Sequence, residues 1–138
     1  MLIQPNSKLL MIGDSVTDCG RKRPIAEGLH PAIGDGFVAF VGSLLMAGYP
    51  DHHIRVVNMG ISGNTVHDLK NRWQTDVLDL APDWLSICIG INDVWRLFGM
   101  PPVLEDHVPV DEYRQTLEEL VLQTRPILKG LILMTPYY

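Results

Sequence analysis

Short, nearly continuous apolar runs alternate along the chain with longer segments in which apolar positions recur every three or four residues. The apolar runs are typical of strands buried on both faces, and they lie at Leu9–Gly13, Ile54–Asn58, Trp84–Ile89 and Leu131–Thr135. The periodic segments between them predict helices at Phe37–Ala47, Val66–Leu80 and Asp111–Thr124. Because strands that alternate with helices are joined by right-handed crossovers, this pattern predicts a parallel, doubly wound α/β sheet.

The second of these helices has the most regular pattern. Its apolar residues are spaced for one buried face, and they are Val66, Leu69, Trp73, Val77 and Leu80. Trp73 is therefore expected in the core. Asn64 or Thr65 can cap the start of this helix, and Gly48 is expected to end the helix before it.

Two long segments carry no regular pattern, at Cys19–Gly36 and Arg96–Pro109. Each begins just after a predicted strand, at the end of a parallel sheet where ligands bind. Both are longer than ordinary connections, which favours a functional role for these loops.

The composition narrows the class of protein. A chain of 138 residues with 46% hydrophobic residues is expected to form a single domain, residues 1–138. Its net charge of −5 argues against a nucleic-acid partner. We find neither a signal-peptide pattern nor an apolar run that could span a membrane. Two cysteines make no disulfide framework, so a reduced, cytoplasmic protein is the simplest interpretation, with Cys88 as a buried thiol.

Three short polar segments each follow a predicted strand: Gly13-Asp14-Ser15, Ile61–Thr65 and Gly90–Asp93. The carboxyl ends of parallel strands meet at one edge, so these segments are expected to converge. A serine there can act as a nucleophile if hydrogen-bond donors meet the oxyanion that develops. Gly63 allows close approach of a backbone N–H to a ligand, and Asn92 has a side-chain amide.

These segments resemble the first three sequence blocks of the SGNH (GDSL) serine hydrolases. The longer stretches Ile12–Arg21, Val57–Thr65 and Ile89–Arg96 are similar to the intracellular acetylxylan esterase branch of that family. The similarity covers essentially the whole chain.

The resemblance implies a flavodoxin-like, three-layer α/β/α fold and an acyl-enzyme mechanism. Ser15 would be the nucleophile, and the oxyanion would be held by the backbone N–H groups of Ser15 and Gly63 and by the amide of Asn92. A histidine, oriented by an aspartate three residues before it, would be the base. The implied substrate is a small acetylated carbohydrate, without metal or organic cofactor, and the implied assembly is a homo-oligomer.

The sequence departs from the family pattern at the base, because Asp-x-x-His does not occur in it. We therefore expect a chain that is incomplete at its C-terminus and lacks a final helix and a fifth strand. Glu27 and His30 have the spacing of an Asp-x-x-His pair, but they lie in the loop after the first strand and not in the family's position for the base. His107 lies in the irregular segment Arg96–Pro109 and could approach the site. The other histidines, His52, His53 and His67, are expected on the surface.

Other residues near the three segments are expected to support the site. Asp14 is expected to hold its turn by hydrogen bonds and Asp93 to organise its loop. Asn64 could support the oxyanion loop or cap the following helix, capping being favoured. Trp95 and Arg96 could line the substrate pocket or pack against a neighbouring subunit.

Three alternatives remain at this point. The same mechanism could serve a thioesterase or lysophospholipase, or the chain could be a catalytically incomplete domain that binds acetylated sugar without cleaving it. A flavodoxin-like phosphate-binding module is disfavoured, because Asp14 and Asp18 would repel phosphate.

Overall fold

The computed structural model describes residues 1–95, 97–98 and 107–136. Its strands are β1 (Lys8–Gly13), β2 (Ala26–Glu27), β3 (Arg55–Gly60), β4 (Trp84–Cys88) and β5 (Gly130–Met134). Its α-helices are α1 (Ser15–Asp18), α2 (Phe37–Gly48), α3 (Val66–Trp73), α4 (Ile91–Trp95) and α5 (Val110–Thr124). Single helical turns of other types lie at Pro50–His52, Gln74–Leu78 and Arg125–Ile127.

The strands form one sheet in the order β2-β3-β1-β4-β5. All four strands expected from the sequence are present, and they pair in parallel. The expectation of a purely parallel sheet is wrong at one edge, where Ala26–Glu27 pairs antiparallel with β3. That two-residue strand lies inside the predicted irregular segment Cys19–Gly36, and it is too short for any periodicity to reveal it.

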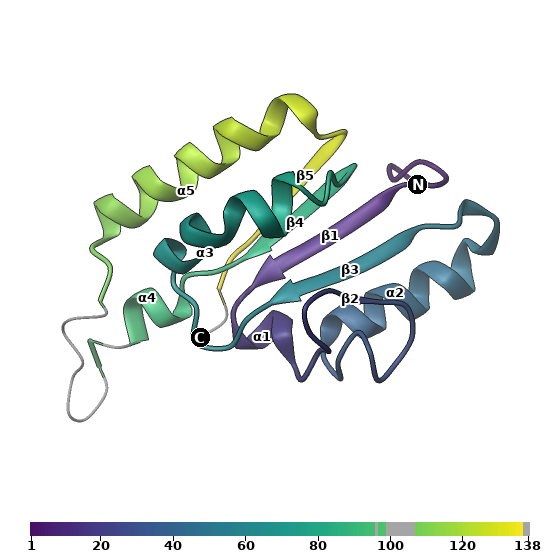
Figure 1. The fold of residues 1–138 in the computed structure, drawn as a ribbon, viewed down its shortest axis with the longest axis horizontal. Helices are drawn as coiled ribbons and strands as arrows, with labels where there is room; N and C mark the ends of the chain where they lie inside the picture. The colour runs from purple at the N-terminus through teal and green to yellow at the C-terminus, as the bar shows by residue number, and fades with distance from the viewer. Residues whose placement is uncertain (96, 99–106, 137–138) are drawn as a thin grey trace.

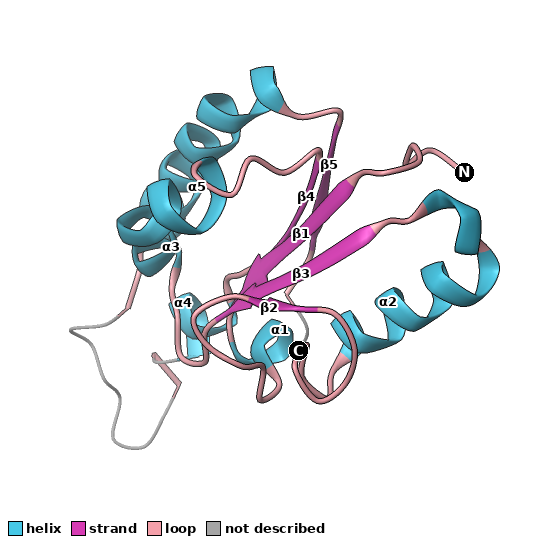
Figure 2. Cartoon of the chain, turned by 45° about the vertical axis from the view of Figure 1, so that its right-hand side comes forward, coloured by secondary structure: helices cyan, strands magenta, loops and turns pink. Residues whose placement is uncertain are grey.

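The helices cover the sheet on two faces, as a doubly wound fold requires. Figure 1 shows α3 and α5 together on one face and α2 on the other, and Figure 2 shows the sheet between them. The arrowheads of β1 and β3 point to the end of the molecule where α1 and α4 lie, whereas the N-terminus lies at the opposite end.

Two apolar clusters stabilise these layers. The larger joins the sheet to α3 and α5 and includes Leu10, Ile87, Trp73 and Leu120, each at most 2% exposed. The smaller joins β1 and β3 to α2 around Val38. Trp73 is in the core as predicted, and its indole N–H donates to Thr124 Oγ1 at 2.8 Å.

The helix expected over Val66–Leu80 is interrupted. It is α-helical to Trp73 and continues as a π-helical turn, in which the N–H of Asp79 donates to Gln74 O at 2.9 Å. Its start is capped by Thr65 rather than Asn64, because Thr65 and Asp68 form a reciprocal capping box. Gly48 is the last residue of α2 rather than a stop beyond it.

The strand β5 lies at the edge of the sheet and carries exposed apolar side chains. Ile132 is 39% exposed and Leu133 is 55% exposed. Within the described residues, this edge of the sheet is therefore apolar and exposed to solvent. In the part of the chain that the structure describes, no helix combines the length and the apolar character needed to cross a membrane.

Candidate active site

The carboxyl ends of three parallel strands are level, and this register assembles the candidate site. Gly13 at the end of β1 lies opposite Gly60 of β3 on one side and Cys88 of β4 on the other. The segments that follow these strands carry Ser15, Gly63 and Asn92. All three therefore lie along one edge of the sheet, as the sequence predicted.

Ser15 is the first residue of α1 and is exposed to solvent. The buried Asp14 caps this short helix, because its Oδ1 accepts the N–H of Val16 at 3.0 Å. This is the turn-holding contact expected for Asp14. Burial raises the pKa of Asp14, and the hydrogen bond from Val16 opposes that effect.

Gly63 lies in a tight loop between β3 and α3. Its φ of 84° is in the left-handed region, which glycine adopts without strain. The loop is fixed to the first strand, since the N–H of Ile61 donates to Gly13 O at 3.0 Å.

The third segment is joined to the second by side chains. Asn92 Nδ2 donates to the carbonyl oxygen of Asn64 at 2.9 Å. Asp93, which is 1% exposed, accepts the N–H of Val66 through Oδ1 at 2.9 Å, whereas its buried Oδ2 has no hydrogen-bond partner among the described residues. Burial raises the pKa of Asp93. The Asp93 carboxylate therefore holds the first turn of α3, whereas its expected role in organising its own loop stays a prediction.

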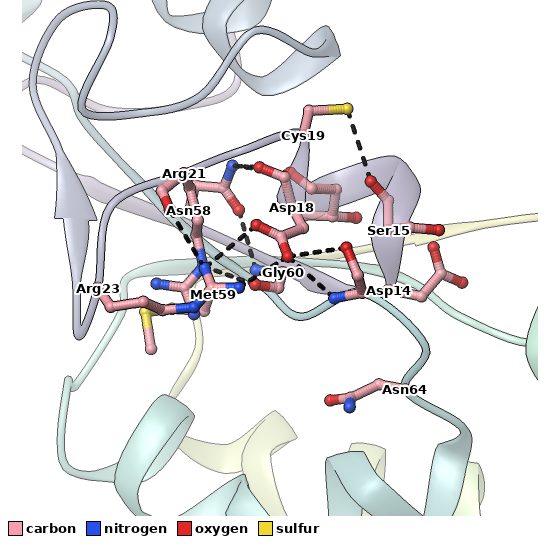
Figure 3. A network of polar contacts seen from close by, with 12 residues as sticks. Asp14, Ser15, Asp18, Cys19, Arg21, Arg23, Asn58, Met59, Gly60 and Asn64 are labelled. Carbon is pink, nitrogen blue, oxygen red and sulfur yellow. Dashed lines mark hydrogen bonds and ion pairs between the residues drawn. The ribbon is translucent and has the colours of Figure 1, made fainter.

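Sequence reasoning missed a carboxylate at the centre of the site. Asp18, the last residue of α1, accepts both the N–H and the hydroxyl of Ser62 at 2.9 Å, and Arg23 donates to its two oxygens at 3.1 and 2.7 Å. Burial alone would raise the pKa of Asp18, but the hydrogen bonds from Arg23 and Ser62 outweigh burial and hold the pKa at about 2. Figure 3 shows Asp18 in this network, between Arg23 and Ser15.

Two arginines that the sequence analysis did not single out satisfy backbone oxygens at the strand ends. Arg21 donates to Gly60 O at 2.6 Å and to Pro24 O at 2.8 Å. Arg72 donates to Met59 O at 2.7 Å and to Gly13 O at 3.1 Å. In the sequence, such contacts are indicated only by an arginine that follows a strand closely or lies on the next helix. That position does not specify which backbone oxygen the arginine contacts.

Asn58 is a further residue that sequence reasoning missed. It is fully buried in β3, and its Nδ2 donates to Thr17 O at 2.7 Å and to Ile33 O at 2.8 Å. It thereby fixes α1 and the long loop after it to the sheet. A buried asparagine inside an apolar strand is a recognisable signal, because such a group requires partners.

The histidines form contacts other than with Ser15. His30 pairs with Asp35, and His67 Nε2 lies 3.1 Å from a carboxylate oxygen of Glu112. His107 Nδ1 lies 3.1 Å from the backbone oxygen of Asp93. Of these three histidines, His107 is the one that contacts a residue of the three predicted segments. His52 and His53 lie at the turn before β3, at the opposite end of the sheet, as expected.

The remaining predicted residues have more varied placements. Trp95 ends α4 and is 59% exposed, whereas Arg96 lies outside the described residues. Cys88 is a buried thiol, and burial raises its pKa. Among the residues that the structure describes, no group of three or more His, Cys, Asp or Glu side chains could hold a metal ion.

Two cavities lie away from this edge. One of about 190 Å³ lies beside β2 and is lined by Glu27, His30 and Arg55 among others. The other, about 510 Å³, is an apolar groove between α5 and β5. Neither cavity is lined by Ser15, Gly63 or Asn92, and Ser15 is exposed at the surface of the candidate site.

Comparisons with known proteins agree with this geometry. The model of the GDSL-like lipase/acylhydrolase family matches residues 11–137. An acetylxylan esterase from Geobacillus stearothermophilus is 60% identical over all 138 residues, and the chain spans 63% of that relative's length. A crystal structure of the same esterase matches the whole chain with a TM-score of 0.97, again covering 63% of the relative.

A second solved relative extends the comparison. It is LAE5, described as an α/β hydrolase from the metagenome of Lake Arreo, and it is 50% identical, with a TM-score of 0.95. The match covers all of this chain and 64% of LAE5. The level strand ends, the three segments that follow them and the match of the family model lead to one conclusion: the chain belongs to the GDSL-like lipase/acylhydrolase family.

Proposed function

We propose that this protein is a serine esterase that removes acetyl groups from xylo-oligosaccharides. The observation that carries the proposal is the level register of Gly13, Gly60 and Cys88, which places Ser15, Gly63 and Asn92 along one edge. The substrate class is supported by the 60% identity to an acetylxylan esterase across the whole chain.

In the proposed reaction, Ser15 Oγ gives its proton to the base and attacks the acetyl carbonyl carbon. The bond between that carbon and the sugar oxygen then breaks, and the sugar oxygen takes the proton and leaves as a hydroxyl group. Water then hydrolyses the acetyl-enzyme and releases acetate. The backbone N–H groups of Ser15 and Gly63 would stabilise the oxyanion together with the amide of Asn92. Asn92 can supply one N–H because an amide has two, and one is bonded to Asn64 O at 2.9 Å.

The proposed base is a histidine oriented by an aspartate, both outside these 138 residues. Catalytic mutants of the Geobacillus relative replace a serine, an aspartate or a histidine by alanine. The relative is longer than this chain, which covers 63% of it. The contacts of His30, His67 and His107 with Asp35, Glu112 and Asp93 support an external base rather than one of these histidines.

The other residues expected near the site complete the proposal. Asp14, Asn64 and Asp93 would support the oxyanion donors, and Trp95 and Arg96 would contact the substrate. The mechanism needs no metal or organic cofactor. The two free cysteines among the described residues support a reducing, cytoplasmic location, and the exposed apolar side chains of Phe40 and Leu44 on α2 support a homo-oligomer.

The test is acetyl-ester hydrolysis by the natural full-length protein and by its Ser15→Ala variant. We expect the substitution to reduce kcat by about a thousandfold or more on acetylated xylo-oligosaccharides, with the fold retained. Ser43→Ala, which removes an exposed hydroxyl on α2, is the matched control and should leave kcat unchanged. Undiminished turnover by Ser15→Ala, or a preference for long acyl chains over acetate, would contradict the proposal.

A further inference from the structure

The loop that carries Gly63 is tied to its surroundings by a charged side chain on each side of that glycine. We call residues 61–64 the Gly63 loop. On one side, the N–H and the hydroxyl of Ser62 both donate to Asp18 Oδ2 at 2.9 Å. On the other side, Arg72 Nε donates to Asn64 Oδ1 at 2.7 Å.

Asp18 links the Gly63 loop to the nucleophile. It is the last residue of α1, the helix that begins at Ser15, and it is 5% exposed. Arg23 holds both of its oxygens, at 3.1 and 2.7 Å, so its carboxylate has a fixed orientation. A shift of Ser62 relative to α1 would break charge-assisted hydrogen bonds to a buried carboxylate.

Arg72 links the same loop to the sheet. Its guanidinium donates to Met59 O and Gly13 O, at the ends of β3 and β1, and pairs with Asp76 at 2.7 Å. Only 13% of its side chain is exposed, and its planar fork fixes several acceptors at once. Because Asn92 donates to the backbone oxygen of Asn64, Arg72 also fixes the residue on which the Asn92 amide depends.

An oxyanion donor is effective only when its N–H is held at the place where charge develops, before the reaction begins. We propose that Asp18 and Arg72 are positioning residues that hold the Gly63 loop at a fixed place relative to Ser15 during acyl transfer. The inference rests on the proposed function. Neither residue touches substrate, and both act through Gly63 and Asn92.

The experiment compares the natural full-length protein with its Asp18→Asn, Arg72→Lys and Arg72→Met variants. Steady-state kinetics on an acetyl ester are combined with the affinity for a boronic acid that forms a tetrahedral adduct on Ser15. We expect kcat per folded molecule to fall about tenfold or more in Asp18→Asn and Arg72→Met, since complete loss of one donor costs 10²–10³. KM should change less than threefold, and boronic acid affinity should fall in parallel with kcat. Arg72→Lys, which keeps the charge but loses the fork, should retain intermediate activity.

Asp83→Asn is the matched control. Asp83 also accepts a backbone N–H, from Lys8 at 2.8 Å, and also pairs with a cation, Lys129 at 2.7 Å, but it lies at the opposite end of the sheet. This variant should keep kcat within twofold of the wild-type value.

Three outcomes would overturn the proposal. The first is an unchanged kcat in both Asp18→Asn and Arg72→Met while the wild type shows Ser15-dependent turnover. This result would overturn the positioning role and leave the proposed esterase function intact. Another is a loss that only follows the unfolded fraction, with unchanged boronic acid affinity per folded molecule. A wild-type protein without Ser15-dependent turnover would overturn the proposed function, and this inference with it.

Discussion

Two buried aspartates contact different segments of the candidate site, and their environments are opposite. Asp18, at the junction of β1 and β3, has hydrogen-bond donors on both oxygens, and its pKa is held at about 2. Among the described residues, Asp93, after β4, has a donor on Oδ1 only, and burial raises its pKa. The first carboxylate stabilises the fold when ionised, whereas ionisation of the second destabilises it.

The difference shows that the two predicted oxyanion donors are supported in different ways. The Gly63 loop is held by charge-assisted hydrogen bonds with Asp18 and Arg72, in addition to a backbone bond from Ile61 to β1. Among the residues that the structure describes, the Asn92 side chain donates to the backbone oxygen of Asn64, and it has no ionic partner there. The junction of β1 and β3 is therefore the rigid part of the site, and the end of β4 depends on it.

The largest effect should come from disturbing the rigid junction at Gly60. A Cβ there would lie 2.2 Å from Asp18 N and 2.6 Å from the carbonyl carbon of Thr17, and neither backbone atom can move away without shifting α1. We expect Gly60→Ala to lower the free energy of unfolding by about 3 kcal/mol, as overpacking does, in a urea titration.

The control for that substitution is Gly48→Ala. A Cβ at Gly48, the last residue of α2, meets no atom within 4 Å, so its effect should be within about 0.5 kcal/mol of zero or slightly stabilising. Equal stabilities of the two variants would show that the packing of α1 on the strand ends is loose.

A smaller effect should separate the two aspartates directly. Asp18→Asn should lower the free energy of unfolding at pH 7 by about 2 kcal/mol, because charge-assisted hydrogen bonds are lost. Asp93→Asn should change it by less than about 1 kcal/mol, because the amide oxygen can still accept the N–H of Val66 and no charge is buried. A larger loss in Asp93→Asn than in Asp18→Asn would reverse the comparison.

The pH dependence of these two variants should differ in sign. Asp18 has a pKa below its ordinary value of 3.8, so its contribution is present above pH 4 and is lost as the pH falls towards 2. Asp93 has a raised pKa, so its carboxyl favours the folded state below its ordinary pKa of 3.8, and that contribution is lost as the pH rises through the raised value.

Urea titrations at several pH values would measure this difference. The free energy of unfolding of Asp18→Asn should be lower than that of the wild type at pH 7, and this difference should disappear between pH 4 and 2. The free energy of unfolding of Asp93→Asn, relative to that of the wild type, should be highest at pH 7 and should fall as the pH is lowered. Parallel pH profiles for all three proteins would exclude the assigned environments.

Local sequence patterns predicted the architecture well, because the strands that carry it are long and apolar. Leu9–Gly13 and Trp84–Ile89 lie within one residue of β1 and β4 at each end, and Trp73 is buried as its spacing indicated. The patterns did not reveal β2, whose two residues pair by position in the fold rather than by periodicity. They also did not show the π-helical turn, since Val77 stays buried in either type of helix.

The candidate site was predictable only in part, for a related reason. Ser15, Gly63 and Asn92 each follow a strand end, so local sequence and topology suffice to bring them together. The role of Asp18 depends on Ser62 and that of Arg72 on Gly13, contacts between residues 44 and 59 positions apart. A single sequence without the fold does not specify such pairs. The expectation that Asn64 caps this helix rather than supports the oxyanion loop failed for a similar reason. Thr65 is the cap, and the Asn64 side chain instead accepts a hydrogen bond from Arg72.

The contact of Arg72 with Gly13 O and Met59 O has a consequence for how this edge opens and for its evolution. Carbonyl groups at strand ends usually exchange hydrogen bonds with water, and loops there fluctuate independently of the sheet. Here a half-buried cation holds the last carbonyl of β1 and the next-to-last of β3. Movement of the Gly63 loop is thus coupled to the cooperative opening of the sheet itself. The exposed turn at residues 28–31 makes none of the contacts with Asp18, Asn58 or Gly60 described above. It can therefore diverge in sequence with little effect on the distance from Ser15 to Gly63.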